Sequence, residues 1–196
     1  VTHVAMSGGG RGGYEAALVA RRLGADVTLI ERDGLGGSTV LTDCVPSKTL
    51  IATSDLLTEV GTASELGVQL PQTVRADLAT VNARVLRLAL AQSSDIAARI
   101  SSAGVTIIDG TARLEGAGVV IATTDAGEER IEVDAVLVAT GAHPRVSDDA
   151  QPDGERILTW EQVYALDEIP EHMIVVGSGV TGAEFASAYN GLGAAV

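Results

Sequence analysis

The feature that most constrains the fold of this chain is a cluster of glycines directly after a short apolar run. The run covers residues 3–6, and a GxGxxG pattern follows it at Gly8, Gly10 and Gly13. A helical pattern comes next and stops at Gly24, since glycine is a good helix C-terminal cap. In such a motif the first glycine makes a tight turn, and the second lets the backbone approach a pyrophosphate. The third lets the helix pack closely on the strand. The pattern predicts a dinucleotide-binding α/β fold.

An acidic residue supports this interpretation. The β-rich run 27–30 ends at Glu31, which follows Gly13 at about the spacing, roughly 20 residues, that a dinucleotide-binding fold uses for its acid. A carboxylate there can accept hydrogen bonds from a ribose diol. The alternative is a glycine-rich turn that only packs. The strand before the motif, the helix after it and the acid beyond favour nucleotide binding over that alternative.

The same pattern returns near the end of the chain. An apolar run at residues 173–176, which we expect to be a strand, leads into Gly177, Gly179 and Gly182, with a helix predicted to start near Ala183. The second strand of this unit should begin where the sequence stops. We therefore expect a fragment that holds one fairly complete domain and the start of another. Two such motifs in one polypeptide indicate a flavin dinucleotide and a nicotinamide dinucleotide, between which the protein transfers a hydride.

The middle of the chain supplies the rest of the predicted first domain. Residues 33–47 have a loop-like composition, with a helix starting near Pro46, because proline suits a first helical position. A long helix is predicted from Asp77, as N-cap, to a stop at Gly104. A β-meander and a buried strand should follow. The predicted meander strands are 105–108, 112–114, 119–121 and 131–133, the buried strand is 134–139, and an exposed connection covers 142–156.

These patterns predict an α/β chain with two parts. Residues 1–150 should form a Rossmann-type dinucleotide-binding domain with a β-meander insertion. Residues 151–196 should form the start of a second Rossmann-type dinucleotide-binding domain.

Charge and cysteine content exclude several classes of function. The chain has 13 basic and 26 acidic residues, a formal net charge of −13, so nucleic acid and anionic membrane surfaces are poor partners for it. No apolar run approaches the roughly 20 residues of a membrane span. One cysteine and three scattered histidines show no metal-binding spacing, so no metal is expected. We expect a soluble, cytoplasmic protein.

The segment at residues 36–48 resembles the pyridine nucleotide-disulphide oxidoreductases. It contains the doubled glycine at 36–37 and the sequence CVPSK at 44–48. The similarity covers the whole chain, including the acid after the second strand, the ATG at 139–141 and the second glycine motif. The family order is an FAD domain, an NAD(P) domain, a return to the FAD domain and a C-terminal dimerisation domain. The resemblance thus implies that residues 1–150 form the FAD-binding domain and that residues 151–196 start the NAD(P)-binding domain. The resemblance implies FAD and NAD(P)H as cofactor and substrate, a homodimer, and a chain that spans roughly the first two-fifths of the whole.

One position departs from the family pattern. Members that reduce disulfides carry two cysteines five positions apart, and here Thr39 takes the first position while Cys44 keeps the second. Threonine cannot form a disulfide, so the thiol–disulfide relay is absent. The pattern resembles the quinone-reductase type of this family. There, electrons would pass from reduced FAD directly to a quinone.

The resemblance also assigns roles to individual residues. It places Cys44 against the flavin, Lys48 near the reactive flavin nitrogen, and Glu184 near both nicotinamide and flavin. The alternatives are a buried, inert thiol for Cys44, a solvated surface lysine for Lys48 and an exposed helix-end acid for Glu184. It further implies that Gly37, Ser38, Thr140 and Gly141 contact FAD, and that the Ala112 backbone contacts its adenine end.

The leading hypothesis is an FAD-dependent NAD(P)H oxidoreductase that reduces a quinone or a similar small acceptor. A dihydrolipoamide dehydrogenase is one alternative, and Thr39 argues against it because dithiol exchange needs both sulfurs. A non-catalytic flavin-binding fragment is the other alternative. The sequence leaves open the acceptor and the choice between NADH and NADPH.

Overall fold

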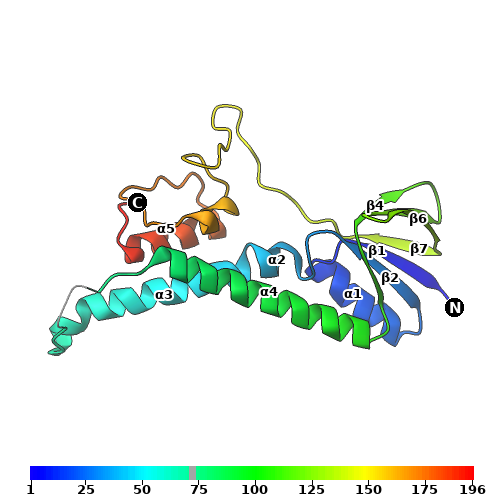
Figure 1. Cartoon of the computed structure of the whole chain (residues 1–196), viewed down its shortest axis with the longest axis horizontal. Coiled ribbons are helices and arrows are strands. Elements are labelled where there is room, and N and C mark those ends of the chain that lie inside the picture. Colours follow the sequence, from blue (N-terminus) through cyan, green and yellow to red (C-terminus); the bar gives the residue numbers. More distant parts are fainter. Residues whose placement is uncertain (71–73) are drawn as a thin grey trace. The chain divides into compact units, whose positions relative to one another are not determined.

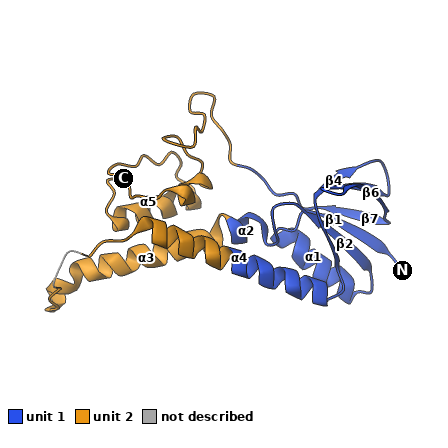
Figure 2. Ribbon diagram, in the orientation of Figure 1, with its two compact units in different colours: residues 1–41, 90–143 blue, residues 42–89, 144–196 orange. Residues whose placement is uncertain are grey.

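The computed structural model describes residues 1–70 and 74–196. The chain forms two compact units (Figure 2). Unit 1 comprises residues 1–41 and 90–143, and unit 2 comprises residues 42–89 and 144–196. Each unit is described by itself. These units do not test the boundary predicted at residue 150 between the two nucleotide-binding domains of the whole protein. That boundary stays a prediction.

Unit 1 is built on a parallel sheet of four strands. Its strand order is β3-β2-β1-β7, and every neighbouring pair is parallel. Helix α1 (Arg11–Arg22) connects the first two strands, so the βαβ unit predicted from the glycine motif is confirmed. The strands, labelled in part in Figure 1, are β1 (His3–Ser7), β2 (Asp26–Glu31), β3 (Thr106–Asp109) and β7 (Ala135–Val138).

The long helix α4 (Leu78–Ser102) has the ends that the sequence predicts. The Asp77 side chain accepts a hydrogen bond from the backbone N–H of Thr80 at 3.1 Å, as an N-cap does. Gly104, with φ +82°, ends the helix in a left-handed conformation. Within unit 1, Ile100 of this helix packs with Leu29 of β2 in one core, and neither side chain is exposed.

The second sheet of unit 1 is an antiparallel meander of three strands, β4 (Thr111–Leu114), β5 (Val119–Thr124) and β6 (Gly127–Glu132). The prediction that the run at 105–108 belongs to this meander is wrong. That run forms β3, which pairs in parallel with β2. The reason is that α4 precedes it, and a helix is the crossover that parallel pairing needs.

Strand β7 is more exposed than predicted. The sequence indicates a buried strand at 134–139, yet Val138 is 61% exposed and Leu137 is 37% exposed. The cause is topological, since β7 is an end strand of the four-stranded sheet in the described chain. An apolar sequence run by itself does not show which strand lies at an edge.

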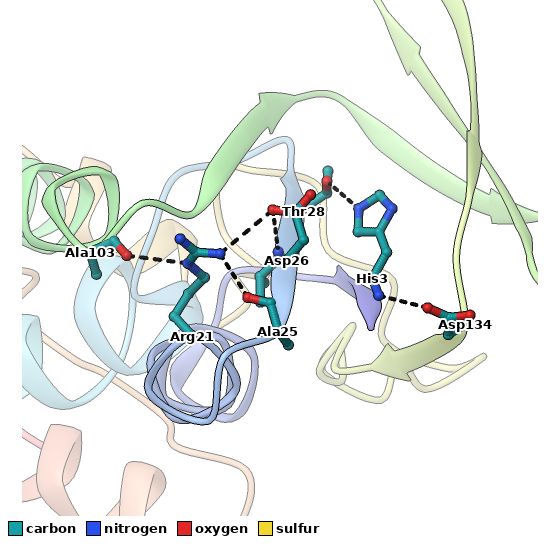
Figure 3. Close-up of polar contacts among 8 residues, drawn as sticks. His3, Arg21, Ala25, Asp26, Thr28, Ala103 and Asp134 are labelled. Carbon is teal, nitrogen blue, oxygen red and sulfur yellow. Dashed lines mark hydrogen bonds and ion pairs between the residues drawn. The ribbon is translucent and has the colours of Figure 1, made fainter. Parts of the chain in front are cut away.

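Side chains at the amino-terminal ends of the strands tie neighbouring segments of unit 1 together (Figure 3). Arg21 donates to the carbonyl oxygen of Ala25 at 2.7 Å and to that of Ala103 at 3.3 Å, which joins the ends of α1 and α4. The backbone N–H of His3 donates to the Asp134 carboxylate at 2.7 Å, next to β7. These contacts fix the end of the sheet that lies away from the glycine loop.

Unit 2 is mainly helical. Its elements are α3 (Cys44–Thr62), the 3-10 turns η1 (Ala63–Leu66) and η2 (Gln162–Ala165), α5 (Val180–Leu192) and the first part of α4. Leu50, Leu78, Tyr164, Phe185 and Tyr189 are buried members of one core cluster. No helix in the described residues is long and apolar enough to cross a membrane.

Two helix boundaries differ from the sequence prediction near the CVPSK segment. The stretch at 33–47, predicted as a loop, contains the short helix α2 (Gly37–Leu41) and the start of α3. Helix α3 begins at Cys44 rather than at Pro46. Proline fits the first turn as well as the first position, because none of the first backbone N–H groups has a partner within the helix.

The apolar run before the second glycine motif is not a strand, contrary to the prediction for residues 173–176. Ile174 is 90% exposed and Val176 is 95% exposed, and only an isolated bridge joins nearby His172 to Ala195. A strand is defined by its neighbour, and the described chain places no strand beside this run. Helix α5 then starts at Val180 rather than near Ala183.

Candidate functional site

The first glycine loop of unit 1 has three glycines with three different environments. Gly8 has φ +103°, and a Cβ there would overlap the Ala139 carbonyl oxygen. A Cβ on Gly13 would overlap the carbonyl oxygen of Gly8. Gly10 precedes α1 and faces open space, since a Cβ there would meet only the Cα of Gly37, at 3.9 Å. These are the turn, the close packing and the free approach that the motif predicts.

Glu31 holds this loop in place. One carboxylate oxygen accepts the backbone N–H of Gly9 at 2.5 Å, and the other accepts those of Arg32 at 2.9 Å and Asp33 at 2.8 Å. A carboxylate has about four acceptor sites, so one is left for another donor such as a ribose hydroxyl. The sequence predicts the ribose contact alone, and the structure adds an anchoring role for Glu31.

The segment after Glu31 folds back onto the same loop. Gly36 donates its N–H to the carbonyl oxygen of Gly9 at 2.9 Å. Gly37 has φ +58°, and a Cβ there would lie 2.7 Å from the Cα of Gly10. Ser38 follows on the exposed side of α2. Sequence reasoning gave no separate role to Gly9, the middle one of three consecutive glycines, or to Gly36, the first of the doubled glycine, although runs of glycine permit close backbone contact.

Two more predicted FAD contacts lie beside the loop at the carboxyl end of β7. Ala139 donates its N–H to Ser7 of β1 at 2.8 Å, which places Thr140 and Gly141 directly after a strand paired with β1. Both residues are exposed, and Gly141 has φ +73°. Parallel α/β sheets bind ligands at this end of their strands.

Ala112 lies on β4, an end strand of the meander. Its methyl group packs against the core that contains Ala5 and Ile30, so its side chain faces the protein. An end strand leaves backbone groups without a strand partner on one side. This placement is compatible with the predicted backbone contact to an adenine.

The second glycine loop, in unit 2, repeats the local geometry of the first. Gly177 has φ +126°, and a Cβ on Gly182 would overlap its carbonyl oxygen. Gly179 caps α5 with φ −72° and ψ 176°, close to the −63° and 178° of Gly10 before α1. A Cβ on Gly179 would meet nothing within 4 Å. The described residues therefore leave open space at the middle glycine of each loop, next to a helix N-terminus.

Unit 2 also brings Lys48 and Glu184 together. Lys48 Nζ donates a short hydrogen bond to Glu184 Oε1, although the two residues are far apart in the sequence. The Lys48 side chain is 61% exposed and that of Glu184 is 19% exposed. The bond raises the pKa of Lys48. Hydrogen bonds from Lys48 and then Ser47 lower the pKa of Glu184. The pair thus remains charged over the neutral pH range.

Cys44 begins α3 and is an exposed free thiol. In the described chain the thiol is thus not buried, and its role stays a prediction. Ser47, one turn further on, is 2% exposed, and sequence reasoning did not identify it as a partner of Glu184. Its position within CVPSK was the available signal. Within residues 1–70 and 74–196, no group of three or more His, Cys, Asp or Glu side chains is placed to hold a metal ion.

The two loops fit dinucleotides. Each combines an unobstructed glycine with a helix N-terminus, where free N–H groups and a partial positive charge bind phosphate. Glu31 adds an acceptor for a ribose beside the first loop.

This combination of a parallel sheet, two dinucleotide loops and a cysteine-bearing helix defines a family. The family described as pyridine nucleotide-disulphide oxidoreductase matches residues 2–196, and the chain belongs to it. These enzymes bind FAD and use NAD(P)H. The resemblance identified from the sequence is therefore confirmed, as is the predicted α/β fold class.

Two curated relatives show which members of the family this chain is similar to. The NAD(P)H dehydrogenase (quinone) of Mycobacterium tuberculosis is 49% identical over 207 residues, which cover 100% of this chain and 42% of the relative. The dihydrolipoyl dehydrogenase of Chlorobaculum parvum is 39% identical over 194 residues, with 98% and 41% covered. The chain thus spans about two-fifths of the length of these curated relatives.

Solved structures agree on the fold. The crystal structure of LpdA from Mycobacterium tuberculosis superposes with a TM-score of 0.90 at 50% identity, covering 99% of this chain and 43% of that one. The HOCl-induced flavoprotein disulfide reductase RclA from Escherichia coli gives a TM-score of 0.82 at 21% identity, which supports the fold alone.

Proposed function

We propose that the whole protein is an FAD-dependent NAD(P)H oxidoreductase that reduces a quinone or a similar small acceptor. The observation that carries this proposal is Thr39. Disulfide reduction needs one thiol to form a mixed disulfide and a second thiol to resolve it, and Cys44 supplies one. The 49% identity to a protein named NAD(P)H dehydrogenase (quinone) supports the same choice.

The two loops divide the nucleotides between them. The first loop, with Gly8, Gly10 and Gly13, would hold the FAD pyrophosphate, and Glu31 would accept a hydrogen bond from the FAD ribose. The second loop, with Gly177, Gly179 and Gly182, would hold the pyrophosphate of NAD(P)H. The support is the open space at the middle glycine of each loop. FAD supplies the two-electron chemistry when bound.

Further contacts complete the proposed FAD site. Gly37, Ser38, Thr140 and Gly141 would contact FAD beside the first loop, and the Ala112 backbone would contact its adenine end. The support is that the first four residues lie at the carboxyl edge of the parallel sheet. Residues 1–150 would form the FAD-binding domain and residues 151–196 the start of the NAD(P)-binding domain.

Lys48 and Glu184 would act as a charged pair in the same chemistry. The Lys48 ammonium would favour negative charge on the bound flavin, and Glu184 would hold that ammonium in place while remaining ionised itself. The support is their hydrogen bond and the opposite shifts of their pKa values. Cys44 would lie against the flavin without taking part in electron transfer. The homodimer and the cytoplasmic location expected from the sequence stay predictions.

Dihydrolipoyl dehydrogenase activity is the second candidate, because relatives with that name are up to 39% identical to the chain. The test uses the full-length FAD-bound protein with NADH and NADPH. We expect quinone reduction, negligible dihydrolipoamide turnover, and retention of most quinone reduction in Cys44→Ser. Robust dihydrolipoamide turnover would overturn the proposal. A bound flavin that neither NADH nor NADPH bleaches would instead support a non-catalytic flavin-binding protein.

A further inference from the structure

We infer that Gly191 and Ser54 are positioning residues, whose contact sets the separation of α3 and α5 and thereby brings Lys48 and Glu184 together. Both helices belong to unit 2. The contact lies about two helical turns from the ion pair, so neither residue needs to touch a ligand. The role of the ion pair in flavin reduction rests on the proposed function. The contact between the two helices does not.

Two contacts define how the helices lie. Near the start of both helices, Lys48 of α3 pairs with Glu184 of α5. About two turns further along each helix, Ser54 of α3 lies against Gly191 of α5. Because the contacts advance in step along both helices, α3 and α5 run parallel and side by side, as Figure 1 also shows.

Gly191 lies in a helix, where glycine is unfavourable. Gly191 does not have a positive φ, so its backbone conformation does not require a glycine. The close approach of α5 to α3 at this position does require one. A Cβ at this position would overlap the hydroxyl oxygen of Ser54 and would lie 3.0 Å from Thr58 Oγ1 and 3.4 Å from the Ser54 carbonyl oxygen. A glycine here lets the α5 backbone reach the surface of α3.

Small side chains lie beside this contact, whereas large side chains of both helices, such as Leu50 and Tyr189, pack in the core around it. Ser47 and Ser54 of α3 and Ala188 of α5 are 2%, 3% and 2% exposed, respectively. Glu184, Ala188 and Gly191 recur at the spacing of one helix face. Because the Cβ would overlap Ser54 at the point where the α5 backbone comes close to α3, it would push the two helices apart. A helix moves as a rigid element over two turns, so Glu184 would move away from Lys48.

Separation of the pair has a chemical consequence besides a structural one. The hydrogen bond from Lys48 is the main reason that the pKa of Glu184 is lowered. If α5 moves outward, this pKa rises toward its ordinary value. The rate of flavin reduction should then begin to fall at a higher pH as the solution is acidified. If Gly191 had a purely structural role, its substitution would lower stability without changing the pH at which the rate of flavin reduction begins to fall.

The experiment compares four variants of the full-length FAD-bound protein. Gly191→Ala adds the Cβ, and Gly191→Val adds side-chain atoms that a rotation of Ser54 cannot accommodate. Ser54→Ala combined with Gly191→Ala removes the overlapping hydroxyl. Gly61→Ala is the matched control, because Gly61 also lies in α3 and a Cβ there would meet nothing within 4 Å. Crystal structures give the Lys48 Nζ to Glu184 Oε1 distance, and stopped-flow absorbance gives the rate of flavin reduction by NADH against pH.

We expect the pair to separate beyond hydrogen-bonding distance in Gly191→Val, with flavin reduction slowed by about tenfold or more, since small displacements at a reacting centre are costly. The decrease in the rate of flavin reduction on acidification should also begin at a higher pH than in the parent. Gly191→Ala should show the same changes more weakly, the double variant should revert toward the parent, and Gly61→Ala should match the parent.

An ion pair that stays intact in both Gly191 variants would overturn the inference. If Gly191→Val does not fold, Gly191→Ala and the double variant decide, and identical pair distances in those two would equally refute it. Lys48→Met tests the proposed function separately. If Lys48→Met reduces its flavin as fast as the parent, the role proposed for the ion pair is wrong. The measured distances would still show whether Gly191 and Ser54 determine the separation of Lys48 and Glu184.

Discussion

The two glycine loops have nearly the same backbone but different surroundings. Gly10 and Gly179 both cap a helix, with φ values of −63° and −72° and ψ values of 178° and 176°. The first loop follows a strand inside a parallel sheet, with Leu29 beside it fully buried. The second follows a run in which Val176 is 95% exposed. The loop geometry is therefore local, whereas the strand before it depends on neighbours.

The loops also differ in what restrains them. Glu31 accepts the N–H of Gly9, and a Cβ at Gly8 would overlap the Ala139 carbonyl oxygen. Around Gly177, by contrast, a Cβ would meet nothing within 4 Å. Within the described residues, the first loop is therefore held on several sides, and the second makes fewer close contacts. This difference predicts unequal responses to matched substitutions.

The largest effect should come from filling the open middle glycine of each loop. In the full-length protein, Gly10→Val should abolish FAD retention, because its side chain would occupy the space needed by a pyrophosphate. Gly179→Val should keep FAD and raise the KM for NAD(P)H by tenfold or more. The absorbance of the purified protein and steady-state kinetics measure the two outcomes. A Gly10→Val variant as yellow as the parent would show that the first loop does not hold FAD.

The next effect concerns the third glycine of each loop. Gly13→Ala should lower the free energy of unfolding by about 1–3 kcal/mol, since its Cβ would overlap the carbonyl oxygen of Gly8, a residue that is itself packed closely against Ala139. Gly182→Ala should cost less in the chain of residues 1–196, because no described residue lies within 4 Å of a Cβ position at Gly177. Denaturant unfolding of this chain measures both. Equal losses would contradict the difference in restraint inferred here. Gly12→Ala, where a Cβ meets nothing within 4 Å, is the control.

Removal of the anchor on the first loop should have a similar or somewhat smaller effect. Glu31→Ala leaves the N–H groups of Gly9, Arg32 and Asp33 without their acceptor. Hydrogen bonds to a charged group contribute about 1.5–3 kcal/mol, and water replaces part of this at a half-buried position. We expect lower stability and weaker FAD binding, with Glu31→Gln in between. Thermal unfolding with and without added FAD separates the two contributions. An unchanged midpoint in both conditions would exclude the anchoring role.

The smallest effect should come from the ion pair of unit 2. The pKa of Glu184 lies below its ordinary value of 4.5, so its contribution to stability is full above that value and is lost as pH falls through the lowered pKa. The pKa of Lys48 lies above 10.5, so its contribution is lost only as pH rises beyond that. Glu184→Gln should lower Tm by at most a few degrees at pH 7. The variant and parent should converge in acid, and a constant difference across pH would contradict the pairing.

Local features of the sequence determined the parts of the fold that depend on neighbouring residues. The glycine spacing of both loops, the cap of α4 at Asp77 and its stop at Gly104 follow from residues within a turn or two. The identity of Thr39 likewise needs no structure, since threonine has no sulfur to exchange. These features carry the family assignment and the proposed chemistry.

Only the tertiary structure decided the features that join distant parts of the chain. An apolar run does not say whether it pairs in a parallel sheet, as β3 does, or lies exposed, as Val176 does, because pairing depends on which strand lies beside it. The close approach of Gly191 to Ser54 depends in the same way on the packing of two helices. Conformational preferences act within a few residues, whereas strand pairing and helix packing depend on side chains brought together by the fold.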